Sequence, residues 1–202
     1  MSVSAILLAA GESTRMGQNK ALLPWKGQTL LEYHLEQLKQ TTVEKTVVVL
    51  GYEAEKLLPH VEKAAKVSVI INLDYPSGRC SSIKAGMRVL PSQSDSVLIL
   101  AVDQPRPYCL LEELIEYHQS YRNLITVPTY EGKHGHPPIF SSSLFPELLE
   151  VSEERMGLLD IMRHYKTQVA ELPVSYPIVL VDLNNAGDYE RALRLREYEA
   201  SR

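Results

Sequence analysis

The chain is poor in cysteine, phenylalanine and tryptophan. Its 202 residues include two cysteines, two phenylalanines and one tryptophan. Two cysteines are too few for the disulfide framework of a small secreted domain, so we interpret Cys80 and Cys109 as reduced thiols of a cytosolic protein. A chain of this length can bury a sizeable apolar core without covalent cross-links.

We expect no targeting segment in this sequence, which also has no excess of positive charge. The N-terminal stretch MSVSAILLAAGESTRMG is too short to span a membrane, and it has no basic residue before its apolar part. We therefore expect a cytoplasmic protein. The formal net charge of -4 argues against non-specific nucleic-acid binding, which needs a basic surface. It leaves open a small anionic ligand, which needs only local positive charge.

Short aliphatic runs alternate with longer amphipathic segments in the first 120 residues. The aliphatic runs predict strands at 3–9, 45–52, 67–72 and 96–103. The amphipathic segments predict helices at 29–40, 53–66, 79–89 and 107–121. We expect Pro59 to break the second helix. Such alternation predicts an α/β fold: a three-layer, Rossmann-like arrangement in which helices cover both faces of a mostly parallel sheet.

The rhythm changes after Asn123. Further strands are predicted at 124–130, 132–141, 166–174 and 177–183, two short helices lie between the second and third of these, and a final helix is predicted at 186–200. No repeat, low-complexity segment or linker interrupts the pattern. We therefore expect residues 1–202 to form one domain.

The first predicted strand leads into a loop with an unusual run of glycine and basic residues, LAAGESTRMGQNKAL. Ligands of open parallel sheets bind beyond the carboxyl ends of the strands, so this loop is well placed for a site. It is not a P-loop, because two residues separate Gly17 from Lys20. Backbone N–H groups around Gly11, with Arg15 and Lys20, suit a phosphate. From these residues alone, a surface loop with solvated charges is the alternative.

The stretch LAAGESTRMGQNKALLP as a whole resembles the signature LAAGxSxRMGxxKxLLP of nucleotidyltransferases with the GT-A-like fold. Within them it is most similar to the molybdenum cofactor cytidylyltransferase branch. The resemblance implies that the loop wraps the triphosphate of the incoming nucleotide. It assigns nucleotide binding to Leu8, Ala9, Ala10, Gly11, Arg15 and Lys20. It also implies a catalytic role for Arg15 and Lys20, which would stabilise the leaving pyrophosphate.

A second motif, NLDYPSGRCSSIKAGM, follows the third predicted strand. It resembles the family segment GMSSSIRAGL, which meets the nucleotide base, and this implies base contacts for Ser81, Ser82 and Asn72. Guanylyl-transferring relatives have a GPLAGI-like segment instead, so the motif favours cytidine. An ordinary helix N-cap is the alternative for the serines. The sequence departs from the family pattern at Arg79 and at Cys80, which we interpret as a packing residue.

Acidic residues at two positions suit a divalent cation. Asp103 ends the fourth predicted strand, where a lone carboxylate can hold Mg²⁺ with water and phosphate oxygens as the other ligands. The family places its Mg²⁺-binding, catalytically essential Asp here, whereas a helix N-cap is the alternative. VLVDLNNAGDYERAL resembles DIDTPEDYERAL, which implies metal binding by Asp182. Asn184 replaces the second acid, and turn chemistry before a helix is the alternative for both residues.

The segment KHGHPPIF resembles GHPVLF of the family, which lies near the second substrate. The resemblance assigns substrate binding to Gly135, His136 and Pro137. A metal site shared by His134 and His136 is the alternative, but no third ligand stands nearby. Arg155 and Gly157 match a family segment loosely and are weaker candidates for the phosphate of the second substrate.

Taken together, the resemblance implies an Mg²⁺-dependent enzyme. It would transfer CMP from CTP to the terminal phosphate of a molybdopterin-type cofactor and release pyrophosphate. A recipient molybdoenzyme or its chaperone is a conceivable protein partner, and neither nucleic acid nor a membrane is expected. A guanylyltransferase, or a transferase for a sugar or alcohol phosphate, is the nearest alternative. Asn184 motivates a further one, a cofactor-binding chaperone without turnover.

Overall fold

The computed structural model describes residues 1–61 and 66–200, with Arg15 and residues 195–200 described by their backbone alone. The strands are β1 (Val3–Ala9), β2 (Pro24–Trp25), β3 (Gln28–Thr29), β4 (Thr46–Leu50), β5 (Val67–Ile71), β6 (Ser96–Ala101), β7 (Ile125–Tyr130), β8 (Lys133–His134), β9 (Ile139–Ser141) and β10 (Val169–Pro173). The α-helices are α1 (Leu30–Lys39), α2 (Ala54–Val61), α3 (Arg79–Arg88), α4 (Tyr108–Tyr121), α5 (Phe145–Leu149), α6 (Leu158–His164) and α7 (Ala186–Ala200).

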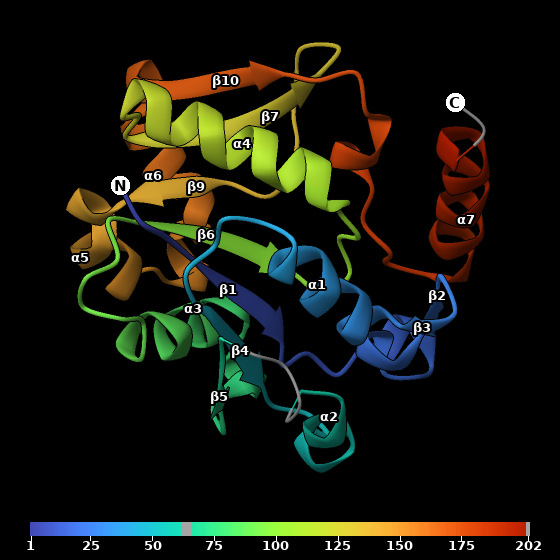
Figure 1. The fold of residues 1–202 in the computed structure, drawn as a ribbon. Helices are drawn as coiled ribbons and strands as arrows, with labels where there is room; N and C mark the ends of the chain where they lie inside the picture. Colours follow the sequence, from blue (N-terminus) through green and yellow to red (C-terminus); the bar gives the residue numbers. More distant parts are fainter. Residues whose placement is uncertain (62–65, 201–202) are drawn as a thin grey trace.

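The main sheet is mostly parallel, as expected. Its strand order is β10-β7-β9-β6-β1-β4-β5, with β8 paired to β7 (Figure 1). The strand β1 is parallel to β4 and to β6, whereas β9 runs antiparallel to β6 and β7. Every residue of β1, β4 and β6 is buried, which explains why these strands are mostly aliphatic, with one hydroxyl residue in each.

Helices cover both faces of this sheet, so the predicted three-layer architecture is confirmed. Alternate residues of β1 serve the two faces: Leu7 packs in a core with α1, α2 and α4, whereas Ile6 and Leu8 pack in a core with α3, α5 and α6. The helix α7 stands apart and contacts the β2–β3 hairpin, where Tyr189 lies against Trp25 with ring centroids 6.2 Å apart (Figure 1).

Two local predictions were wrong. Pro59 does not break its helix, because α2 continues through it to Val61, and Leu57 and Val61 on either side of the proline anchor α2 in the core. Burial of these side chains offsets the hydrogen bond that proline cannot make. Residues 62–65 of the same predicted helix lie outside the described residues. The predicted strand at 177–183 is a short 3-10 helix, Pro177–Leu180, followed by irregular chain.

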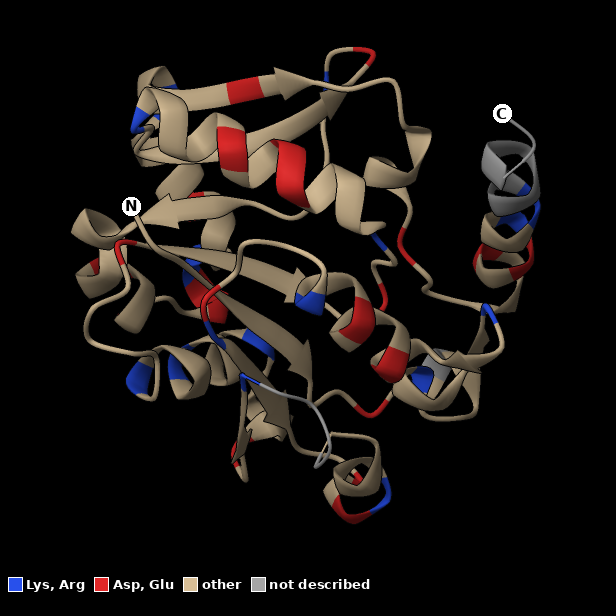
Figure 2. Ribbon diagram, viewed as in Figure 1, with Lys and Arg blue, Asp and Glu red and all other residues tan. Residues whose placement is uncertain are grey.

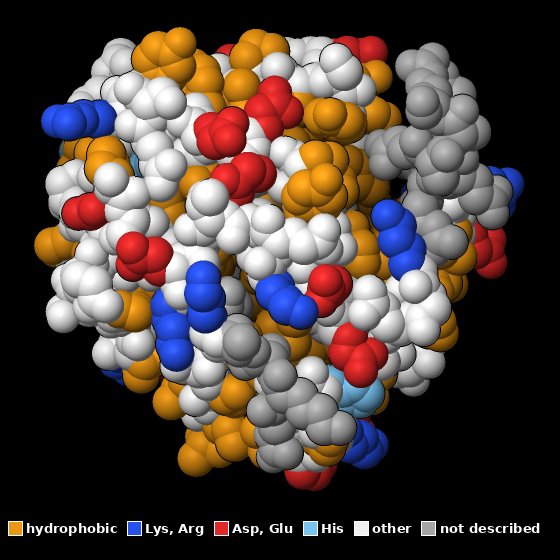
Figure 3. All heavy atoms as spheres, viewed as in Figure 1, with side chains coloured by type: hydrophobic (Ala, Val, Ile, Leu, Met, Phe, Trp, Pro, Cys, Tyr) orange, Lys and Arg blue, Asp and Glu red, His pale blue; other side chains and the backbone are white. Residues whose placement is uncertain are grey.

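Charged residues of both signs are interspersed over helices and loops (Figure 2). On the face seen in Figure 3, lysine and arginine side chains lie among aspartate and glutamate side chains. Among the helices within residues 1–61 and 66–200, none combines the length and the apolarity needed to cross a bilayer.

Candidate active site

The carboxyl ends of β1 and β6 open into a cleft of about 340 Å³. Seven of the residues predicted for the site line it: Leu8, Ala9, Ala10, Gly11, Lys20, Ser82 and Asp103. Other lining residues are Ser13, Thr14, Asn19, Tyr75, Gly78, Arg79, Ala101 and Val102. The cleft therefore brings together the loop after β1, the end of β6 and the start of α3, which are far apart in the sequence.

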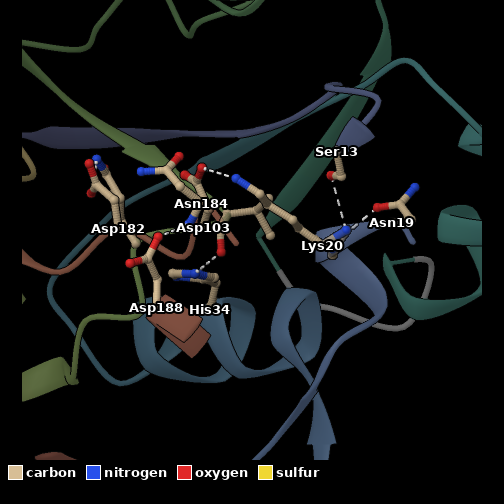
Figure 4. Close-up of polar contacts among 11 residues, drawn as sticks. Ser13, Asn19, Lys20, His34, Asp103, Asp182, Asn184 and Asp188 are labelled. Atoms are coloured by element: carbon tan, nitrogen blue, oxygen red, sulfur yellow. Dashed lines mark hydrogen bonds and ion pairs between the residues drawn. The ribbon is translucent and has the colours of Figure 1, made fainter. Parts of the chain in front are cut away.

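The loop after β1 is held in place by its own polar groups. Ser13 has a left-handed backbone, with φ of 56°, and its hydroxyl accepts a 3.1 Å hydrogen bond from the backbone N–H of Lys20 (Figure 4). The Asn19 side chain accepts another from Ala21 N–H at 3.1 Å. The Tyr52 N–H donates to the carbonyl of Ala10 at 3.0 Å, which ties the loop to the end of β4. The loop thus has a defined backbone on which an anion can dock.

Lys20 and Asp103 meet at the floor of the cleft. The Lys20 ammonium lies 2.8 Å from Oδ2 of Asp103, and the two side chains are 11% and 26% exposed (Figure 4). An ion pair this far from water is screened less than one on the surface. The helix α4 starts at Tyr108 with Pro107 as its N-cap residue and without a side-chain cap. Asp103 therefore does not cap that helix, which removes the structural alternative for this carboxylate.

Asp182 lies beside Asp103, on the chain that leads to α7. Backbone N–H of Leu183 donates to the Asp103 carbonyl at 2.8 Å, and the Gln104 side chain donates to Oδ1 of Asp182 at 2.9 Å. In Figure 4, Asp103 lies between Lys20 and Asp182. The neighbouring Asn184 is also on this segment, and its N–H donates to the Asp188 carboxylate at 3.2 Å. The site thus combines the carboxylates of Asp103 and Asp182 with the ammonium of Lys20.

His34 supports the end of β6 from below. Its imidazole is fully buried, and Nε2 lies 2.9 Å from the carbonyl of Val102, the residue before Asp103. Burial lowers the pKa of His34 to about 4, so the ring is neutral at pH 7 and Nε2–H donates to that carbonyl. This contact fixes the backbone next to the catalytic candidate without adding charge to the cleft.

Asn72, Ser81 and Ser82 form one hydrogen-bonded group at the start of α3. The Asn72 amide donates to the Ser81 hydroxyl at 2.8 Å and to the Ser82 hydroxyl at 3.1 Å. Ser82 lines the cleft, whereas Asn72 and Ser81 are not among its lining residues. Neither serine caps α3, since its N-cap residue is Gly78 without a side-chain cap bond. The amide therefore orients the serine that faces the cleft.

A second cleft of about 480 Å³ adjoins the first, and Arg79 lines both. Gly135 and His136, predicted to meet the second substrate, line this second cleft together with Gly157. Pro137 and Arg155 are not among its lining residues. Burial lowers the pKa of His136, with the negative charge of Asp182 opposing the shift, and its Nδ1 has no hydrogen-bond partner among the described residues.

The alternative metal site at His134 is not formed. His134 lies at the end of β8 and its Nε2 is 2.7 Å from the Glu171 carboxylate of β10. In the part of the chain that the structure describes, no three residues of the His, Cys, Asp and Glu types gather in a metal-binding group. A cation at Asp103 and Asp182 would thus have two carboxylate ligands from the chain, with the rest supplied by substrate and water.

Cys80 is a buried packing residue, as interpreted from its sequence. Its backbone N–H donates to the Glu153 carboxylate at 2.7 Å. Burial, together with Glu153, raises the pKa of the thiol to about 11. Cys80 lines the second cleft with the thiol in its protonated form at neutral pH.

A model of the MobA-like NTP transferase domain matches residues 5–169. The chain belongs to the MobA-like NTP transferase family. It is accordingly a nucleotidyltransferase, and the fold and the loop after β1 agree with that assignment. The matched range includes every residue that lines the first cleft, whereas Asp182 lies outside it.

Two curated relatives cover most of the chain. The molybdenum cofactor cytidylyltransferase of Escherichia coli strain K12 is 26% identical over 93% of this chain and 94% of its own length. The nicotine blue oxidoreductase of Paenarthrobacter nicotinovorans is 30% identical over 71% of this chain and 73% of its own. Among solved structures, Rv0371c of Mycobacterium tuberculosis H37Rv superimposes with a TM-score of 0.83 at 24% identity, covering 96% and 98% of the two chains. A manganese complex of Rv0371c gives a TM-score of 0.78.

Sequence reasoning missed several residues of this site. Arg106 is fully buried and bonds the backbone carbonyls of His136 and Val181, and Gln104 donates a hydrogen bond to Asp182. Both stand in the motif VDQPR, but their partners lie 30 to 78 residues further along the chain, so no local pattern identifies them. The side chain of Arg15, a predicted phosphate ligand, is outside the described part of the structure.

Proposed function

We propose that this nucleotidyltransferase transfers CMP from CTP to the terminal phosphate of a molybdopterin-type cofactor and releases pyrophosphate. The observation that carries the proposal is the pair of adjoining clefts, with the Lys20–Asp103 ion pair in the first and Arg79 lining both. One cleft has a backbone suited to a triphosphate, and the other has room for a second substrate. The cytidylyltransferase relative from Escherichia coli supports the choice of donor and acceptor.

The donor binds on the loop after β1. Backbone N–H groups of residues 10–14, with Lys20 and Arg15, neutralise the β- and γ-phosphates and stabilise the pyrophosphate as it leaves. In this proposal the Lys20 ammonium moves from Asp103 to the phosphates when the nucleotide arrives. Ser82 meets the base, and the Asn72 amide orients Ser82 and Ser81.

A magnesium ion fits the donor set of the site. Asp103 and Asp182 supply hard carboxylate oxygens, the ligands that Mg²⁺ prefers, and nearby triphosphate oxygens and water supply the rest. When bound, Mg²⁺ neutralises charge on the α-phosphate and polarises it. The manganese complex of the structural relative Rv0371c is consistent with a divalent cation in this fold.

The chain's own residues then act by positioning. The acceptor phosphate is already an anion, so the step needs no protein base. One acceptor oxygen forms a bond to the α-phosphorus while the bond from that phosphorus to the bridging oxygen breaks, and pyrophosphate carries away the electron pair. Gly135 and His136 hold the acceptor beside Arg79, which lines both clefts, and Pro137 follows them outside the cleft lining. A neutral His136 can donate or accept a hydrogen bond there without repelling a cation.

The proposal is tested by measuring pyrophosphate release with CTP, GTP, ATP or UTP, in the presence of a molybdopterin-type acceptor and Mg²⁺. We expect pyrophosphate release with CTP and with none of the other three nucleotides. This release should be absent when either the acceptor or Mg²⁺ is left out. Release with GTP instead moves the protein to guanylyl transfer. Tight binding of the pterin without pyrophosphate from any nucleotide contradicts turnover and supports the chaperone alternative.

A further inference from the structure

Arg106 is a fully buried arginine three residues after Asp103, in the connection between β6 and α4. Every polar partner of its guanidinium is a backbone carbonyl. Nε donates to His136 at 2.8 Å, and Nη2 donates to Val179 at 3.0 Å. Nη1 donates to Val181 at 3.0 Å and to Pro105 at 3.1 Å. Four bonds from one planar group fix the relative positions of three chain segments.

These segments carry the two halves of the proposed reaction. His136 belongs to the wall of the second cleft, whereas Val181 immediately precedes Asp182. A hydrogen bond of 2.9 Å from His136 N–H to the Val179 carbonyl joins them directly. At Gly135 an added Cβ would lie 2.7 Å from that same carbonyl, so the two segments touch as closely as backbones can. Arg106 therefore holds together the backbone around Gly135 and His136, which we call the acceptor wall, and the backbone just before Asp182. We refer to its hydrogen bonds to these two segments as the clasp.

The charge of Arg106 also belongs to the site. Burial lowers the pKa of its guanidinium to about 10, and the negative charges of Asp182 and Asp103 oppose the shift. The group is still cationic at pH 7, and it compensates the repulsion between the two carboxylates. Arg106 is not among the residues that line either cleft, so it acts on the reaction only through other residues.

We propose that Arg106 is a positioning residue. Its hydrogen bonds hold the acceptor wall and Asp182 in fixed positions relative to Asp103. The inference rests on the proposed function for its kinetic consequences, but not for its structural ones. A phosphoryl acceptor must approach in line with the leaving group, and misplacement of about 1 Å can cost 100-fold in rate. Loss of the clasp should therefore weaken acceptor and metal use together, while the donor loop, which Arg106 does not touch, keeps its affinity for CTP.

Two variants separate the clasp from its charge. Arg106→Lys keeps the cation but cannot reach four carbonyls, and Arg106→Met removes both. For Arg106→Lys we expect the KM for the acceptor and the Mg²⁺ concentration for half-maximal rate to rise by roughly tenfold or more, as for other residues that orient ligands. The dissociation constant for CTP, measured by calorimetry without acceptor and without Mg²⁺, should stay within about twofold.

His118→Leu is the matched control. His118 is fully buried, and its imidazole bonds Ser96 at 2.9 Å and Thr126 at 2.8 Å, at the opposite end of β6 from Asp103. This variant loses a buried polar network and stability without touching the clasp. It should lower the thermal midpoint while the acceptor KM and the Mg²⁺ requirement stay at wild-type values.

Hydrogen exchange gives a readout that does not depend on turnover. In Arg106→Lys, peptides covering 135–138 and 177–183 should exchange faster, while those covering β4 and the loop after β1 should not. Unchanged acceptor KM, a parallel loss in CTP affinity, or faster exchange spread evenly over the chain would overturn the proposal. If the wild-type protein releases no pyrophosphate with any nucleotide, the proposed function fails, and localised exchange still decides the positioning role of Arg106.

Discussion

The Lys20 ammonium lies 2.8 Å from the Asp103 carboxylate, and both residues line the first cleft. In the proposed mechanism, Lys20 competes with the divalent cation for this carboxylate when no nucleotide is bound. A triphosphate relieves this competition, because it attracts the ammonium and brings metal ligands of its own. We therefore expect Mg²⁺ and nucleotide to bind cooperatively, each strengthening the other.

Replacement of Lys20 by methionine should separate its contribution to CTP binding from its competition with the metal ion. The KM for CTP should rise by roughly 10- to 100-fold, which corresponds to the loss of a charge-assisted hydrogen bond. Binding of Mn²⁺ alone, followed by electron paramagnetic resonance, should become tighter, because the competing ammonium is gone. Lys56→Met, which removes an exposed lysine paired with Glu53, is the control and should change neither value. Weaker Mn²⁺ binding in Lys20→Met would contradict the competition.

Replacement of Asp103 by asparagine should lower kcat by more than about 100-fold, since the neutral amide is a poor ligand for a hard cation. The fold should persist, because the side chain is partly exposed and no helix depends on it for a cap. Asp95→Asn removes an acid from the other end of β6, where it accepts from Ser2 N–H at 2.7 Å, and should leave turnover intact. Near-normal turnover of Asp103→Asn, measured as pyrophosphate release, would remove Asp103 from the metal site.

Two buried histidines predict a loss of stability in mild acid. The pKa values of His34 and His118 are lowered from 6.5 to about 4 by burial, so the folded protein keeps both neutral while the unfolded chain binds protons below pH 6.5. Stability is therefore full above pH 6.5 and falls between pH 6.5 and 4, by about 1.4 kcal/mol per pH unit for each histidine. Urea unfolding over this range measures the slope. The His118→Leu variant should lose the contribution of one histidine to the pH dependence of the unfolding free energy. An unchanged slope would contradict the lowered pKa of His118.

The two cysteines should differ in reactivity. At pH 7 a thiol with a pKa of about 11 is ionised in about one molecule in ten thousand, and Cys80 is also buried. Cys109 is exposed at the start of α4. Iodoacetamide followed by peptide mass spectrometry should label Cys109 first and Cys80 only on unfolding. Equal labelling of both in the native protein would show that the second cleft opens further than the structure indicates.

The sequence predicted the sheet and the residues that line the first cleft well because their signals are local. Buried parallel strands such as β1 and β6 are mostly aliphatic, and the loop after β1 has its glycine and basic residues within the ten positions from Gly11 to Lys20. The same reasoning gave a wrong prediction for residues 177–183. Its apolar run resembles a strand, but the carbonyls of Val179 and Val181 turn to Arg106 instead of to a neighbouring strand.

Other features depend on contacts that no window of the sequence contains. Arg106 finds its acceptors 30 and 73 residues away, and nothing near it distinguishes a buried clasp from a surface arginine before a helix. Pro59 is tolerated in α2 because Leu57 and Val61 reach the core, which the proline signal does not reveal. In both cases burial in the folded protein, and not local propensity, determines the structure that the residue adopts.

The central claim, transfer of a nucleotidyl group from CTP to a phosphate acceptor, is tested most directly by following labelled phosphorus. The protein is incubated with a molybdopterin-type acceptor, Mg²⁺ and CTP labelled at either the α- or the γ-phosphate, and the products are separated. We predict that the α-label appears on the pterin and the γ-label in pyrophosphate, with neither product formed by Asp103→Asn. A γ-label on the pterin, or no labelled pterin at all, would contradict the account.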